Sequence, residues 1–118
     1  MIERLQKRKI EEMLGKGKAI MIMGARQVGK STLLSEMFGG QKGVMWMNGD
    51  DADVRQLFSG MTSTRIRALL SGCRYLVIDE AQRIPDIGLR LKLITDQVPE
   101  VQVVATGSSS FELAARVG

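Results

Sequence analysis

The sequence predicts an α/β protein with a parallel β-sheet, and two observations lead to this fold class. Four short apolar segments, at 19–23, 44–47, 75–78 and 101–105, alternate with segments of helical periodicity. The first of them runs directly into a glycine-rich pattern, G-x-x-x-x-G-K-S, at 24–31, which a helical pattern follows. Because strands that alternate with helices are joined by right-handed crossovers, the four strands are expected to be parallel.

The elements of the first half follow from periodicity and helix-end signals. Residues 1–17 are predicted to form a leader, in which 3–14 is a basic amphipathic helix packed on the domain. After the glycine-rich pattern a helix is expected at 31–38, where two successive glycines end it. Beyond the second strand, either Asp50 or Asp51 is expected to cap the next helix.

The second half continues the alternation. A short helix with Ile66 facing inward precedes the third strand, and a turn at 83–85 precedes a helix at 86–97. One face of that helix carries the apolar residues Ile87, Leu91, Ile94 and Val98. Leu89 and Leu93 lie on its other side, covered either by loops of this chain or by material outside it.

The glycine-rich pattern predicts a phosphate-binding loop. Its two glycines permit backbone conformations that other residues avoid, and its N–H groups then point inward at the positive end of the following helix. Lys30 would reach the β- and γ-phosphates, and Ser31 would ligate Mg²⁺. The alternative is a glycine-rich turn that happens to carry Lys-Ser. The predicted nucleotide-binding residues are Gly24, Ala25, Arg26, Gln27, Val28, Gly29, Lys30, Ser31 and Thr32.

Asp79 and Glu80 directly follow the third predicted strand. Asp79 is expected to hold the Mg²⁺ shell through water, and Glu80 to polarise the water that attacks the γ-phosphate. A hydrolase needs both carboxylates, because the metal and the nucleophile occupy different points around the reacting phosphorus. The alternative is a solvated acidic turn.

Polar residues also follow the other strands, and ligands of open α/β sheets bind at this carboxyl edge. Among the residues after strand four, Ser108 is the first candidate for a catalytic hydroxyl that senses the γ-phosphate, and Thr106 is the second. Both residue types are also ordinary loop formers. Asn48, after strand two, is a candidate to hydrogen-bond Glu80 and hold it away from water, or a structural turn residue.

Composition sets the broad class. The chain has 118 residues, 44% hydrophobic and 25% charged, as expected for one globular domain spanning 1–118. One cysteine, Cys73, and no histidine exclude an internal disulfide and a zinc site, so a reducing, cytoplasmic setting is expected. The net charge of +4 permits nucleic-acid binding without indicating it, and the apolar runs are too short to span a membrane.

With these residues in place, the chain resembles the AAA-type ATPase domain of a prokaryotic family of P-loop ATPases whose members often carry a C-terminal nuclease-like domain. The resemblance covers nearly the whole chain and lies in Met23 to Leu34, Met47 to Asp51, Leu76 to Gln82 and Thr106 to Ser110. It implies a three-layer, additional-strand P-loop fold of the RecA/AAA type, with strand order 1-4-3-2. It also implies a fifth strand, a lid and an arginine finger beyond Gly118, so the chain is expected to be the N-terminal part of such a domain.

These inferences predict an ATPase module that binds ATP or ADP with Mg²⁺ and drives or switches an attached or partner domain. In the full-length protein a homo-oligomer would complete the site, and Arg116 is expected to be a surface residue rather than the arginine finger. Two alternatives remain open. One is a nucleotide-gated switch with little turnover, and the other is a small-molecule P-loop kinase, which the glutamate after Asp79 disfavours.

Overall fold

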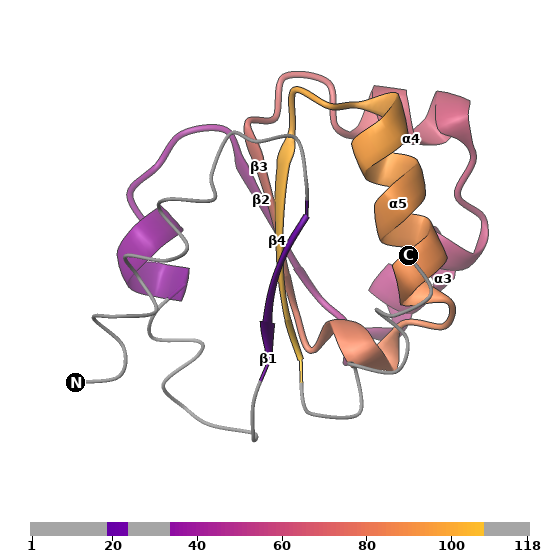
Figure 1. The fold of residues 1–118 in the computed structure, drawn as a ribbon, viewed down its shortest axis with the longest axis horizontal. Helices are drawn as coiled ribbons and strands as arrows, with labels where there is room; N and C mark the ends of the chain where they lie inside the picture. Colours follow the sequence, from indigo (N-terminus) through magenta and orange to yellow (C-terminus); the bar gives the residue numbers. More distant parts are fainter. Residues whose placement is uncertain (1–18, 24–33, 108–118) are drawn as a thin grey trace.

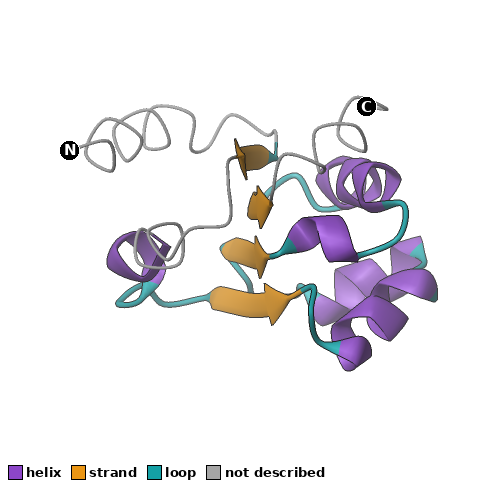
Figure 2. Cartoon of the chain, turned by 90° about the horizontal axis from the view of Figure 1, so that it is seen from below, coloured by secondary structure: helices purple, strands orange, loops and turns teal. Residues whose placement is uncertain are grey.

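The structure, a computed structural model, describes residues 19–23 and 34–107, which form a parallel sheet with helices on both faces (Figure 1). Residues 34–38 are helical and lie on one face. The other elements in chain order are β1 (Ile20–Met23), β2 (Val44–Asn48), α3 (Ala52–Ser59), α4 (Ser63–Leu69), β3 (Tyr75–Asp79), the 3-10 helix η1 (Ala81–Arg83), α5 (Ile87–Gln97) and β4 (Gln102–Gly107). Figure 2 shows the same layers from below.

The four strands are parallel and lie in the order β1-β4-β3-β2. β4, the last in sequence, therefore lies between the first and the third, as the family resemblance implies. All four carboxyl ends meet at one edge of the sheet. The α/β fold, the parallel sheet and the strand order 1-4-3-2 are confirmed.

Side chains alternate between the two faces along each strand and form two cores. On one face, Leu76 and Ile78 of β3 join Val103 and Ala105 of β4 in the larger core, under α3, α4, η1 and α5. That core buries the predicted inward face of α5: Ile87, Leu91, Ile94 and Val98 are each 3% exposed or less.

The other face carries a smaller core beneath the helical residues 34–38. Leu34 and Phe38 pack there against Val77 of β3, Val104 of β4 and the isoleucines of β1. In the sequence, these helical residues follow the predicted phosphate loop, which lies outside the described residues.

Side-chain caps explain where two short helices begin. Asp51, rather than Asp50, caps α3, and its carboxylate accepts a 2.8 Å hydrogen bond from the Asp53 N–H. Thr62 caps α4 by accepting from the Arg65 N–H at 3.3 Å. Each cap satisfies one of the N–H groups that a helix start leaves without an intrahelical partner.

Three differences from the sequence prediction have physical causes. β4 extends through Thr106 and Gly107, which follow the predicted strand 101–105, because both pair with β1 and are buried. Arg83 ends a 3-10 helix instead of starting a turn. Of the second apolar stripe on α5, Leu93 packs on the larger core while Leu89 stays 55% exposed.

Within the described part of the chain, no helix combines the length and the apolar character that crossing a membrane requires. The predicted leader helix and Arg116 lie outside the described residues.

Candidate functional site

The sheet register brings three polar side chains into one row at the carboxyl edge. Asn48 of β2 pairs with Asp79 of β3, and Thr106 of β4 follows the pair Ile78 and Ala105 by one residue. Asp79 is two residues beyond Val77, so its side chain projects from the face that helix 34–38 covers. The row therefore lies on the face of the sheet that residues 34–38 cover.

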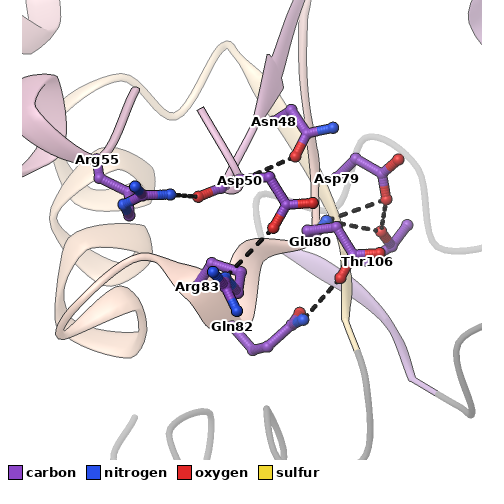
Figure 3. Close-up of polar contacts among 9 residues, drawn as sticks. Asn48, Asp50, Arg55, Asp79, Glu80, Gln82, Arg83 and Thr106 are labelled. Atoms are coloured by element: carbon purple, nitrogen blue, oxygen red, sulfur yellow. Dashed lines mark hydrogen bonds and ion pairs between the residues drawn. The ribbon is translucent and has the colours of Figure 1, made fainter. Parts of the chain in front are cut away.

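Asp79 and Thr106 are joined by a short hydrogen-bond network (Figure 3). The Thr106 hydroxyl, which is fully buried, donates to Asp79 Oδ1 at 2.5 Å. The Glu80 N–H donates to the same Oδ1 at 3.0 Å and to Thr106 Oγ1 at 3.3 Å. Two donors on one oxygen fix the plane of the Asp79 carboxylate, which is the requirement for a ligand that must face a metal in a defined direction.

Glu80 follows in a backbone conformation that few residues adopt. Its φ of 50° and ψ of 45° lie in the left-handed region, which costs a residue other than glycine about 1–2 kcal/mol. The Glu80 carbonyl accepts from the Arg83 N–H at 3.1 Å, which closes the first turn of η1. The Glu80 carboxylate accepts a 2.7 Å hydrogen bond at Oε1 from Gln82 Nε2, as Figure 3 shows.

The turn after β2 packs directly against the Asp79-Glu80 turn. The Gly49 N–H donates to the Asp79 carbonyl at 2.7 Å, and Asn48 Oδ1 accepts from the Asp50 N–H at 2.8 Å. A Cβ added to Gly49 would overlap the Glu80 carbonyl oxygen, so only glycine fits at this contact.

Two arginines brace the same turn from outside. Arg55 Nη1 donates to the Gly49 carbonyl at 2.8 Å. The Arg83 guanidinium lies 3.3 Å from the Asp50 carboxylate, and both of these side chains are more than half exposed (Figure 3). The β2 and β3 turns thus form one connected unit at the carboxyl edge.

β1 ends at the same edge, and β4 separates it from β3 and Asp79. Its pairing with β4 sets Ile22 beside Thr106 and Met23 beside Gly107. Since neighbouring strands are about 4.8 Å apart, the end of β1 lies about 10 Å from the end of β3. The end of β1 and Asp79 therefore lie at the same edge of the sheet, with β4 between them.

The predicted site residues divide into two groups. The structure brings Asp79, Glu80 and Thr106 together, with the Thr106 hydroxyl bound to Asp79 and to the backbone of Glu80. Asn48 stands in the same row, but its carboxamide oxygen caps its own turn, and Gln82 is the side chain bonded to Glu80. The other predicted residues, at 24–32 and Ser108, lie outside the described residues.

Sequence reasoning missed Gln82 and Gly49. Gln82 follows Glu80 by two residues, and a polar amide so close to a candidate base was the available signal. Gly49 looked like a common turn glycine, since its contact with Glu80 depends on the pairing of β2 with β3.

Comparison with known proteins assigns this architecture to a family. No curated protein matches the chain. A family model described as an AAA domain matches residues 16–118, which points to a nucleotide-binding module of the ATPase type. The match extends over most of the chain and includes all four strands, so the chain belongs to this AAA domain family.

Proposed function

We propose that this chain binds ATP with Mg²⁺ and hydrolyses it as a P-loop ATPase module. One observation carries the proposal. The Asp79 carboxylate, fixed by Thr106, projects from the face of helix 34–38 at the edge where β1 ends. The G-x-x-x-x-G-K-S pattern begins at the next residue after β1, which supports a single site that contains the phosphate loop and the acidic pair.

The residues available suit Mg²⁺ in a nucleotide site. Mg²⁺ prefers oxygen ligands and is usually held by one or two protein groups together with phosphates and water. Asp79 supplies a carboxylate with a fixed plane, and the Ser31 hydroxyl would supply the second protein ligand. When bound, the ion would neutralise charge on the β- and γ-phosphates, while Lys30 would contact their oxygens.

Glu80 is the proposed general base. It follows the metal ligand by one residue, and its left-handed backbone turns its side chain away from the direction a continued strand would give it. Its carboxylate would accept a proton from the water that attacks the γ-phosphate. Ser108, in the segment after β4, remains the proposed hydroxyl that senses the γ-phosphate.

The resemblance to prokaryotic AAA-type ATPases supports three further proposals. The module acts in the cytoplasm as a homo-oligomer, and a neighbouring subunit supplies the arginine finger. Hydrolysis drives or switches an attached domain, for which the nuclease-like C-terminal domain of the resembling proteins is the model. An arginine finger contributes about 10³ to 10⁵ in rate, so turnover is expected to rise with assembly of the oligomer.

Nucleotide binding and phosphate release test the proposal separately. Titration with a fluorescent ADP analogue should give saturable binding that Lys30→Ala weakens at least tenfold, while Lys42→Ala, at an exposed lysine in a turn, should bind like the parent. Phosphate release from Mg-ATP should fall at least about 10²-fold in Glu80→Gln and stay unchanged in Glu100→Gln, an exposed control. Equal binding by Lys30→Ala and the parent would refute the loop assignment.

A nucleotide-gated switch with little turnover is the second candidate, and a specific contact favours it. The Asp79 carbonyl is bonded to Gly49, so a shift of the Asp79-Glu80 turn moves the start of α3 with it. Under this alternative the parent binds nucleotide tightly, and Glu80→Gln leaves the slow rate of phosphate release unchanged.

A further inference from the structure

Glu80 is held at both its backbone and its side chain, by different groups. The backbone N–H is bonded to Asp79 and Thr106, and the carbonyl is bonded to Arg83 and packed against Gly49. These contacts leave rotation about the side-chain bonds as the remaining freedom of Glu80. The 2.7 Å hydrogen bond from Gln82 to Oε1 restricts that rotation.

Gln82 is itself on a fixed support. It occupies the middle of η1, whose first residue, Ala81, is fully buried in the larger core. The Ile84 N–H donates to the Ala81 carbonyl at 3.0 Å, next to the bond between Arg83 and Glu80. The Gln82 side chain is half-buried and reaches back to Glu80. The hydrogen bonds of η1 hold the backbone of Gln82 in a defined position relative to Glu80.

The chemistry of the contact suits a residue that orients a general base. Gln82 donates to one oxygen of the carboxylate and carries no charge, so it orients the group without pairing its negative charge. Within 19–23 and 34–107, no group donates a hydrogen bond to the second oxygen, Oε2. That oxygen is the one left to accept the proton of the attacking water.

We propose that Gln82 is a positioning residue that sets the rotamer of Glu80 for proton abstraction. This inference rests on the proposed ATPase function and adds a residue to it. Gln82 acts through Glu80, so its loss should lower kcat with little effect on nucleotide affinity. Misplacing a catalytic group by about 1 Å can cost up to 10²-fold, and Glu80 keeps its backbone contacts, so a decrease of about tenfold is expected.

The first experiment measures kcat and the dissociation constant of the ADP analogue in the 118-residue chain. Gln82→Ala should lower kcat about tenfold with unchanged affinity, and Gln82→Glu should lower it at least as far, because an ionised carboxylate cannot donate to Glu80. Gln97→Ala is the matched control, since it removes a glutamine that accepts a 2.6 Å hydrogen bond from Arg67 on a distant helix pair. It should leave both constants unchanged.

A double-mutant cycle tests whether Gln82 works through Glu80. In a Glu80→Gln background, Gln82→Ala should cause no further decrease, because the base that it orients is already gone. An unchanged kcat in the single variant, or the same tenfold loss in both backgrounds, would overturn the proposal.

A measurement without turnover completes the test. The side-chain amide resonances of Gln82 in a ¹⁵N-labelled sample should shift on Glu80→Ala, while those of Gln97 stay in place; no response at Gln82 also overturns the proposal. Failure of the proposed function has a different signature, since Lys30→Ala and Glu80→Gln would then leave nucleotide binding and phosphate release unchanged.

Discussion

At each end of the sheet a residue has a positive φ, but the residue type differs between the two ends. At the amino end, Gly43 takes a positive φ of 75° before β2, and its carbonyl accepts from the N–H groups of Arg74 and Tyr75. At the carboxyl end, the positive φ of 50° after β3 belongs to Glu80. Glycine adopts this conformation without steric cost, whereas glutamate does not.

The hydrogen bonds differ in the same way. The contacts just described at the amino end join backbone to backbone, including the Gln102 N–H to the Arg74 carbonyl at 2.9 Å. At the carboxyl end, the carboxylates of Asp79 and Glu80 accept from Thr106 and Gln82. Strain at a residue other than glycine persists only where the surrounding structure holds it, and such residues gather at functional sites. We infer from this contrast that glutamate, rather than glycine, occupies position 80 because its carboxylate is needed there.

The largest predicted effect comes from filling the contact between the two carboxyl-end turns. In Gly49→Ala, the new Cβ meets the Glu80 carbonyl, a backbone atom that cannot turn aside. The β2 and β3 turns must separate, and the bond from Gly49 to Asp79 is strained with them. We expect a loss of about 3 kcal/mol of unfolding free energy, at the upper end for overpacking, measured by urea denaturation.

Gly40→Ala is the control for this substitution. No atom lies within 4 Å of the position a Cβ would take on Gly40, and the residue is exposed. Its stability should stay within about 1 kcal/mol of the parent or rise slightly. Similar losses in both variants would show that the approach of Gly49 to Glu80 is not the cause.

The next effect tests the buried hydroxyl that fixes Asp79. Thr106→Val keeps the shape of the side chain and removes both the donor to Asp79 and the acceptor for the Glu80 N–H. A hydrogen bond to a charged group contributes about 1.5–3 kcal/mol, so a loss of about 2 kcal/mol is expected. Binding of the ADP analogue in Mg²⁺ should weaken as the Asp79 carboxylate loses its fixed plane.

Thr95→Val provides the comparison. Its hydroxyl donates at 3.0 Å to the Lys92 carbonyl within α5, away from the carboxyl edge. Removal should cost less than about 0.5 kcal/mol and leave Mg²⁺-dependent binding intact. An equal Mg²⁺ dependence in Thr106→Val and the parent would contradict the role assigned to the Thr106 hydroxyl.

A smaller effect on stability is expected when Glu80 is replaced by glycine, the residue type that has a positive φ at the amino end. Glu80→Gly relieves about 1–2 kcal/mol of left-handed strain, but it loosens the unfolded chain by about 0.4–1 kcal/mol and loses the bond to Gln82. The stability should remain within about 0.5 kcal/mol of the parent, whereas phosphate release should fall at least about 10²-fold.

Asp86→Gly is the control that distinguishes relief of backbone strain from loss of the Glu80 carboxylate. Asp86 also has a positive φ, 55°, but it is exposed and its side chain makes no cap bond to α5. This variant should gain about 0.5 kcal/mol and keep its phosphate release. If Asp86→Gly lost activity as Glu80→Gly does, the introduction of glycine at a left-handed position, rather than the loss of the Glu80 carboxylate, would account for the effect.

Much of the fold could be predicted from the sequence, because alternation and helix-end signals are local. The third strand was predicted at 75–78 and ends at Asp79, and the apolar face of α5 is buried as expected. Strand order is different, since periodicity says nothing about which strands are neighbours, and it came from the family resemblance. β4 was predicted too short because Thr-Gly-Ser is typical of loops, whereas burial decides the matter for Thr106.

For the candidate site, the sequence predicts which residues lie at the carboxyl edge, but it does not predict the contacts among them. Asp79 and Glu80 were identified from their place after an apolar strand. The partner of Glu80 was not, because Asn48 and Gln82 are both plausible donors until the left-handed turn aims the carboxylate toward η1. The contact between Gly49 and Glu80 likewise requires a strand register that sequence patterns do not supply.

The smallest effect is expected from the ion pair that spans the same two turns. Arg83 and Asp50 lie 3.3 Å apart, but both side chains are more than half exposed, so water and salt screen their attraction. A double-mutant cycle with Arg83→Ala and Asp50→Ala should give a coupling energy of about 0.2–0.5 kcal/mol that decreases with salt. Coupling above about 1 kcal/mol would mean that charge, rather than the close backbone contact at Gly49, holds the two turns together. Gly49→Ala would then not be expected to cause the largest loss of unfolding free energy at the carboxyl end.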